Sequence, residues 1–143
     1  MTRTRNAHQT PRLMRLLIAS DTPELVQFAQ QTVQGERDIL VIGVATSGRE
    51  AIQKATLLRP DVVLLDLDLR DLDGLQVTEA ITSRIQTGVV LMSVHAEPEY
   101  LSRAMMVGAR GYLITPLPGE MVSDALHSAW HGMLQSDQAT EER

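Results

Sequence analysis

Five short, largely apolar segments alternate with five segments whose apolar residues recur at helical spacing, and this alternation constrains the fold more than any other feature. Apolar runs of this kind are typical of strands that are buried on both faces of a parallel sheet. The predicted strands cover residues 13–19, 39–45, 62–66, 88–93 and 111–114. The predicted helices cover residues 23–34, 48–58, 74–85, 98–108 and 119–133.

The connections between these segments are short, so each strand must return beside its neighbour through a right-handed crossover that contains a helix. Five such units predict an α/β fold, a doubly wound (βα)5 domain with a five-stranded parallel sheet. The flavodoxin-like strand order 2-1-3-4-5 is a common solution for five strands. It makes the carboxyl ends of the first and third strands neighbours, and ligands bind at that point in open α/β sheets.

Four carboxylates lie at or after the end of the third strand, those of Asp66, Asp68, Asp71 and Asp73. Such a group repels itself unless water or a cation offsets the charge. One interpretation is a solvated acidic loop, and the other is a divalent-cation site centred on Asp66. The predicted strand order favours the second, because it brings Asp21 from the end of the first strand to Asp66 and Asp68. Oxygen ligands of this kind suit Mg²⁺.

Length and composition limit the class of protein. A chain of 143 residues with 43% apolar and 22% charged residues is typical of one globular domain. The absence of cysteine excludes disulfides and thiolate metal sites and fits a reducing compartment. No apolar run approaches the roughly 20 residues of a membrane span, so we expect a cytoplasmic protein.

The predicted domain covers residues 13–133. Residues 1–12 are rich in arginine and polar residues, which indicates a flexible leader or, alternatively, a phosphate-binding arm. Residues 134–143 are polar and charged, which indicates a frayed end or the start of a linker. The net charge of −5 argues against nucleic acid as the partner of this domain.

Residues 13–132 resemble the receiver domain of two-component response regulators (CheY-like). The resemblance rests on the segment 60–66 with the turn 73–75, on the strand end 91–93, and on the segment 108–113. Residues 92–110 look most like receivers fused to ParA/MinD-like pilus-assembly ATPases.

The resemblance implies a function in phosphorelay signalling. It implies that Asp66 accepts a phosphoryl group and that Mg²⁺ is held by Asp21, Asp66 and the backbone carbonyl of Asp68. Ser93 and Tyr112 match the switch residues of the family, and Pro116 the proline that follows a cis peptide bond. The domain is then no enzyme beyond its own phosphorylation chemistry.

The implied partners are a histidine kinase or phosphotransfer protein and an effector, either separate or fused after residue 143. A second copy of the chain is a further partner, through the face formed by the fourth helix, the fifth strand and the fifth helix.

Two positions of the predicted pocket depart from the family pattern. Ser20 stands where receivers have a second acid, and Thr115 stands where they have lysine. The only lysine of the chain, Lys54, belongs to the second predicted helix. The loss of one acid and the loss of one lysine leave the net charge of the pocket unchanged. The pocket is therefore expected to bind Mg²⁺ but to hold phosphate weakly. Two functions stay open: a phosphorylation-operated switch, and an atypical receiver that acts as a phosphorylation-independent docking or dimerisation module.

Other candidate residues are expected to be peripheral. His127 and His131 stand four apart on the last predicted helix, without a third metal ligand nearby in the sequence, and are assigned to its solvated face. His95 follows Ser93 in the loop over the predicted site; a surface role is expected, and a contact with phosphate is the alternative. The helix over residues 98–108 is expected to pack through a stripe of Leu101, Met105 and Gly108, so that Met105 and Met106 divide between core and surface.

Overall fold

Five parallel strands form one sheet of order β2-β1-β3-β4-β5 in the computed structural model, which describes residues 12–141 and their side chains up to residue 134. The strands are β1 (Met14–Ala19), β2 (Ile39–Ala45), β3 (Val62–Asp66), β4 (Gly88–Ser93) and β5 (Gly111–Ile114). The helices are α2 (Pro23–Gln34), α3 (Gly48–Leu58), α4 (Gly74–Thr82), α5 (Pro98–Met106) and α6 (Gly119–Glu141). The predicted fold class and strand order are confirmed.

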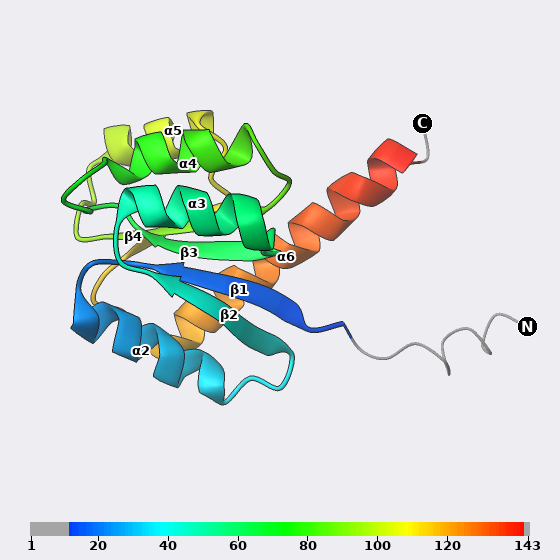
Figure 1. Cartoon of the computed structure of the whole chain (residues 1–143), viewed down its shortest axis with the longest axis horizontal. Coiled ribbons are helices and arrows are strands. Elements are labelled where there is room, and N and C mark those ends of the chain that lie inside the picture. The colour runs from blue at the N-terminus through cyan, green and yellow to red at the C-terminus, as the bar shows by residue number, and fades with distance from the viewer. Residues whose placement is uncertain (1–11, 142–143) are drawn as a thin grey trace, which may run out of the picture.

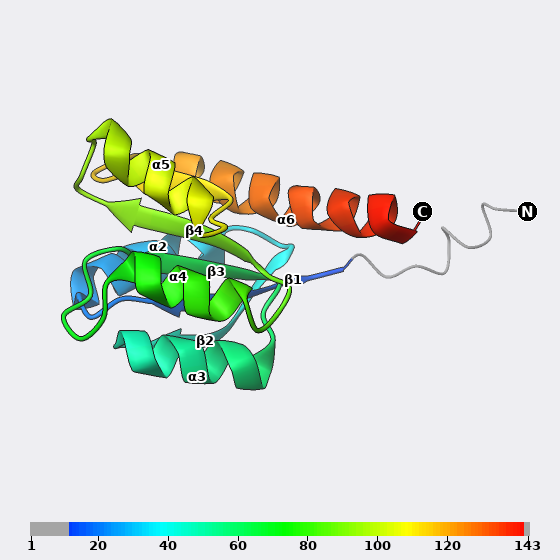
Figure 2. The same cartoon turned by 90° about the horizontal axis from the view of Figure 1, so that it is seen from above.

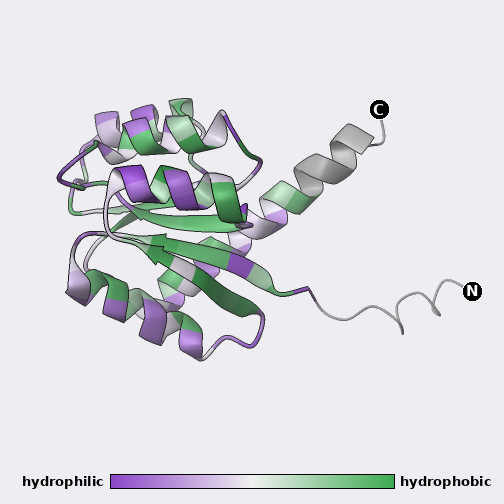
Figure 3. Ribbon diagram, in the orientation of Figure 1, coloured by the Kyte–Doolittle hydropathy of each residue, from purple (hydrophilic) through white to green (hydrophobic). Residues whose placement is uncertain are grey.

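Successive side chains of the strands point to opposite faces of the sheet and form two cores. Leu17 and Leu65 belong to the core under α3, α4 and α5, whereas Ile18 and Leu64 belong to the core under α2 and α6. Figures 1 and 2 show these two helical layers on either side of the sheet. The strands are almost uniformly hydrophobic, while the helices alternate in hydropathy (Figure 3), because only one stripe of each helix is buried.

The central strand β3 places its last residue at the edge where β1 also ends. All five residues of β3 are buried, and Leu65 is paired with Ala19, the last residue of β1. The loop after β3 is closed by Asp73, which caps α4 in a capping box with Gln76. The chain passes so close here that a Cβ on Gly74 would lie 2.6 Å from the Cα of Leu67.

The ends of three helices differ from the sequence prediction, and one of them is α5, which ends at Met106 instead of residue 108. Helix α4 ends at Thr82 instead of residue 85, and α6 continues through residues 134–141, which were expected to be frayed. No glycine or proline follows Gly132, and glutamine, alanine and glutamate favour helix, which explains the longer α6. The predicted leader lies outside the described residues except for residue 12. No helix within residues 12–141 has the length and apolar character needed to cross a membrane.

Helix α5 packs through a different stripe than the sequence suggested. Tyr100, Ala104 and Val107 contact the core, and Ala104 is fully buried. Met105 and Met106 were expected to divide between the core and the surface. Met105 is 45% exposed, and Met106 is 84% exposed. The expected core role of Met105 is therefore wrong, because the buried stripe lies one residue earlier, with Ala104 at its centre.

Candidate functional site

Asp66 lies at the carboxyl end of β3 with only 6% of its surface exposed. Its Oδ2 accepts a hydrogen bond from the hydroxyl of Ser20 at 2.8 Å, and its Oδ1 accepts one from the backbone N–H of Asp68 at 2.9 Å. Ser20 directly follows β1 and is 1% exposed. The ends of β1 and β3 therefore meet at this carboxylate, as the strand order predicted.

Burial raises the pKa of Asp66, because the ionised carboxylate loses hydration. The hydrogen bonds from Asp68 and Ser20 lower this pKa, and the charges of Asp68 and Asp21 raise it further. The net effect is a raised pKa. A cation beside Asp66 would offset both the lost hydration and the repulsion.

Asp21 connects the end of β1 to the loop after β3. Its Oδ2 accepts the backbone N–H of Arg70 at 3.0 Å and lies 3.9 Å from Nε of the same residue. The Asp21 side chain is 17% exposed. The charge of Asp21 acts on Asp66, as the predicted convergence requires, and Asp21 lines a separate pocket together with Ser20.

The carboxylate of Asp68 is directed toward the end of β4. Its Oδ1 lies 3.2 Å from Nε2 of His95, and its Oδ2 accepts a long hydrogen bond of 3.4 Å from the hydroxyl of Ser93. The metal-binding role expected for the backbone carbonyl of Asp68 stays a prediction.

A chain of contacts joins Ser93 to Tyr112 through His95. The backbone N–H of His95 donates to Ser93 Oγ at 2.9 Å, and the hydroxyl of Tyr112 donates to the His95 carbonyl at 2.8 Å. The His95 ring stacks on Tyr100 with the centroids 4.5 Å apart. Burial raises the pKa of Tyr112, which keeps its hydroxyl protonated as a donor.

His95 is therefore a residue of the site, and its assignment to the surface missed this role. Its position two residues after Ser93 was the only sequence signal. Its partners Asp68 and Tyr112 are far from it in sequence, and the fold brings them together.

Thr115 faces the same pocket as Asp66. Both line a cavity of about 420 Å³ together with Asp68 and Ser93, and the backbone N–H of Thr115 donates to the Ser93 carbonyl at 2.8 Å. None of the described residues that line this pocket is basic. The peptide bond between Thr115 and Pro116 is cis, in agreement with the expectation.

Lys54 does not replace the missing lysine. Its ammonium donates to the carbonyl of Val44 at 2.7 Å and lies 3.2 Å from the carboxylate of Glu50. These contacts hold it on α3, among the residues of α3 and β2.

The family model of the response regulator receiver domain matches residues 16–127. The chain belongs to this family. The match contains β1 from Leu16 onward, the other four strands, all of the acidic group and the switch positions. The receiver domain of two-component response regulators is thus the identity of the folded unit.

Curated relatives of the receiver are longer than this chain. The nitrate/nitrite response regulator protein NarL of Escherichia coli (strain K12) is 32% identical over 125 residues, which are 87% of this chain and 58% of that protein. The transcriptional regulatory protein DesR of Bacillus subtilis (strain 168) is 28% identical over 122 residues, which are 84% of this chain and 60% of that protein. The chain thus spans less than two thirds of either relative.

Solved receiver structures share the fold. The signal receiver domain of a modulated diguanylate cyclase from Desulfovibrio desulfuricans G20 has a TM-score of 0.78 at 25% identity, over 87% of this chain and 98% of that chain. The response regulator domain of Thermotoga maritima CheB has a TM-score of 0.74 at 22% identity, over 82% of this chain and 97% of that chain. The finer likeness to receivers of pilus-assembly ATPases stays a prediction, because these relatives are of other kinds.

Away from the receiver pocket, the assignment of His127 to a solvated face is wrong. Its side chain is 24% exposed, and Nε2 lies 2.9 Å from a carboxylate oxygen of Asp38. His131 is exposed. The partner of His127 stands 89 residues earlier in the chain, so spacing along α6 gave no sign of it.

Proposed function

We propose that this receiver accepts a phosphoryl group on Asp66 with bound Mg²⁺ and thereby switches a protein-interaction face. The observation that carries the proposal is the buried Asp66 carboxylate at the end of β3, held by Ser20 and the N–H of Asp68, with Asp21 beside it. The expected donor is a phosphohistidine on a histidine kinase or phosphotransfer protein, and the cytoplasm is the compartment that such a pair implies.

In the reaction, a carboxylate oxygen of Asp66 forms a bond to phosphorus while the bond between phosphorus and the donor imidazole breaks. The electron pair of that bond remains on the imidazole nitrogen, which then takes up a proton. Each Asp66 oxygen accepts one hydrogen bond from the protein and retains capacity for another contact. The two hydrogen bonds fix the carboxylate, and such positioning supplies much of the catalysis of phosphoryl transfer.

The donor set around Asp66 fits Mg²⁺. Carboxylates of Asp21 and Asp66 with the backbone carbonyl of Asp68 are hard oxygen ligands, and an octahedral ion would complete its shell with water. Mg²⁺, when bound, neutralises charge that develops on the phosphoryl oxygens.

The hydrogen bonds from Ser93 to Tyr112 support a switching role. A phosphoryl group on Asp66 offers acceptors to the Ser93 hydroxyl, which now donates weakly to Asp68 at 3.4 Å. The Ser93 hydroxyl oxygen accepts a hydrogen bond from the N–H of His95, so a movement of Ser93 would displace His95. The carbonyl of His95 accepts the hydroxyl of Tyr112, so Tyr112 would be displaced in turn. The signal thereby reaches β5.

The face beside this network is apolar and exposed, which suits an effector or a second copy of the chain. It is formed by α5, β5 and the start of α6. Its exposed apolar residues are Leu101, Met105, Ile114 and Met121.

Incubation with a small phosphodonor and Mg²⁺, followed by intact-mass measurement, tests the proposal. The parent protein should gain one phosphoryl group and Asp66→Asn should gain none. Asp124→Asn, which alters an exposed acid on α6, should behave like the parent. A parent protein without any mass gain would overturn the proposal and favour the phosphorylation-independent docking module.

A further inference from the structure

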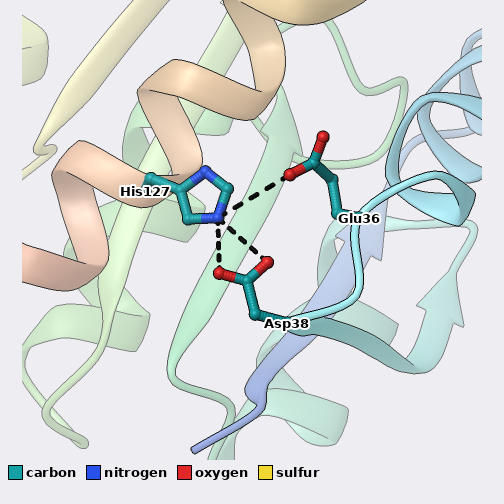
Figure 4. Close-up of side chains that lie close together, drawn as sticks. All are labelled: Glu36, Asp38 and His127. Atoms are coloured by element: carbon teal, nitrogen blue, oxygen red, sulfur yellow. Dashed lines mark hydrogen bonds and ion pairs between the residues drawn. The ribbon is translucent and has the colours of Figure 1, made fainter. Parts of the chain in front are cut away.

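Three potential metal ligands converge at the opposite end of the sheet from the receiver pocket. Glu36 and Asp38 lie in the connection between α2 and β2, and His127 lies on α6 (Figure 4). One ligand atom from each residue lies within 4.8 Å of the other two. Within the described residues, this is the group of histidine and acidic side chains that meets this condition.

The histidine presents the correct nitrogen to the two acids. Its Nδ1 lies 2.9 Å from the backbone carbonyl of Ser123. A carbonyl only accepts hydrogen bonds, so Nδ1 must carry hydrogen. This is the outer contact by which metal-binding histidines are usually oriented. Nε2 is then the atom directed at Asp38 and Glu36.

The space between Nε2 and the carboxylates requires positive charge. Nε2 lies 2.9 and 3.1 Å from the two oxygens of Asp38 and 3.9 Å from Oε1 of Glu36. Ionised carboxylates only accept hydrogen bonds, so a neutral ring would set its lone pair against theirs. Either a proton on Nε2 or a metal ion removes this conflict.

The separations suit a small tetrahedral ion. Two ligands that each lie about 2.0–2.1 Å from tetrahedral zinc are about 3.3 Å apart. The separations of 2.9 and 3.9 Å from Nε2 to the two acids bracket this value. Imidazole with carboxylates suits zinc and similar divalent transition ions, whereas Mg²⁺ prefers oxygen ligands alone.

The backbone holds both acids in place. The carbonyl of Asp38 accepts the N–H of Met14 at 2.7 Å, and the N–H of Glu36 donates to the carbonyl of Val33 at 2.9 Å. The side chains of Glu36, Asp38 and His127 are 34%, 44% and 24% exposed. An ion can therefore reach the three ligands from solvent and keep water in a fourth position.

We propose that Glu36, Asp38 and His127 form a site for Zn²⁺ or a similar divalent transition ion, which clamps the α2–β2 connection to α6. The site is independent of the Asp66 pocket and of the proposed phosphorylation. Ion binding to the folded state alone stabilises it by mass action, so occupancy is visible as a rise in melting temperature.

Thermal unfolding of the full chain with increasing ZnCl₂ tests the clamp. The test uses the variant Asp21→Asn, which removes the response expected at the Asp66 pocket. The melting temperature of this variant should rise with zinc and stay unchanged with MgCl₂. His127→Gln and Asp38→Asn should each weaken the apparent zinc affinity by about tenfold or more. Glu120→Gln, which alters an exposed acid in the first turn of the same helix, is the matched control and should leave the zinc response unchanged.

Ring signals in nuclear magnetic resonance spectra of the parent provide a second measurement that does not depend on the variants folding. Zinc should shift the Nε2 signal of His127 more than that of His131, whose ring centroid lies 6.3 Å from that of His127. No response of His127 to zinc would mean that the three residues form only an ion pair between imidazolium and carboxylate. That result, or a zinc response that survives when His127→Gln is combined with Asp21→Asn, would overturn the proposal.

Discussion

Burial makes the ionised carboxylate of Asp66 costly to the folded protein. Its pKa is raised by lost hydration first, so the folded state binds this proton more tightly than the unfolded chain does. The penalty is fully present when the pH is above the folded-state pKa. It disappears as the pH falls below the ordinary aspartate pKa of about 3.9.

Asp66→Asn should therefore raise the melting temperature at neutral pH by a few degrees, since 1 kcal/mol corresponds to roughly 2–8 °C in domains of this size. The advantage should shrink as the pH falls toward 4, because the parent carboxyl then becomes neutral as well. Scanning calorimetry between pH 4 and 7.5 measures both effects. A variant that is less stable than the parent at neutral pH would show that the hydrogen bonds to Asp66 outweigh its burial.

Magnesium should bind weakly at the same residues. We expect dissociation constants of about 0.1 to several millimolar, because the site offers few protein ligands and an ion that keeps its waters. MgCl₂ should raise the melting temperature of the parent, and Asp21→Asn should abolish the rise. Asp124→Asn serves as the exposed control. An unchanged melting temperature of the parent in saturating MgCl₂ would contradict the site.

Among the residues of the site, the sequence predicted those contacts that the strand order alone determines. Asp21 follows β1 and Asp66 ends β3, and these two strands must be neighbours, so the convergence of the two acids could be inferred from the sequence. The contacts of His95 and His127 could not be inferred from the sequence, because each contact depends on where side chains of distant segments point. The missing lysine was visible directly, but only the structure shows that Lys54 is held elsewhere.

Among the elements, the turn from β3 into α4 controls the shape of the acidic loop. A Cβ on Gly74 would lie 2.6 Å from the Cα of Leu67 and 2.9 Å from its carbonyl oxygen, both backbone atoms. Neither can move without displacing the loop that carries Asp68. The N–H of Gly74 also donates to this carbonyl at 3.0 Å.

Gly74→Ala should therefore destabilise the domain by about 1–3 kcal/mol, the usual cost of overpacking. Because the loop must shift, the variant should also lose the stabilisation by Mg²⁺. Urea unfolding with and without MgCl₂ measures both. Gly35→Ala is the matched control, since a Cβ there meets nothing within 4 Å and the backbone is right-handed helical. Equal losses in the two variants would show that the contact with Leu67 is not the cause.

Existence and order of the elements were predictable because periodicity and short connections leave few alternatives. The ends of the elements and the faces that the helices bury were less predictable. Helix α5 could be placed in the sequence, but its inner stripe depends on how closely it approaches β5. The small Ala104 permits that approach, and the larger Met105 and Met106 are left exposed.

At the scale of the whole molecule, phosphorylation of Asp66 should change the conformation of the α5, β5 and α6 face. The size of this change depends on how strongly the pocket binds the phosphoryl group. Thr115 offers one neutral hydrogen bond where a lysine would offer a charged one. The difference between such bonds is about 1–2 kcal/mol, which is comparable to the gap between two conformations of a switch. Coupling from Asp66 to Tyr112 should therefore be incomplete in the parent.

The double variant Thr115→Lys with Ser20→Asp should strengthen this coupling without changing the net charge of the pocket. We would record amide spectra of parent and variant with Mg²⁺, with and without beryllofluoride, and follow the signals from Ser93 to Tyr112. These signals should move further in the double variant than in the parent. Ser20→Asp alone, which adds repulsion beside Asp66 without a cation, should not reproduce the gain. A parent whose signals already move fully would show that the lysine is dispensable for switching in this receiver.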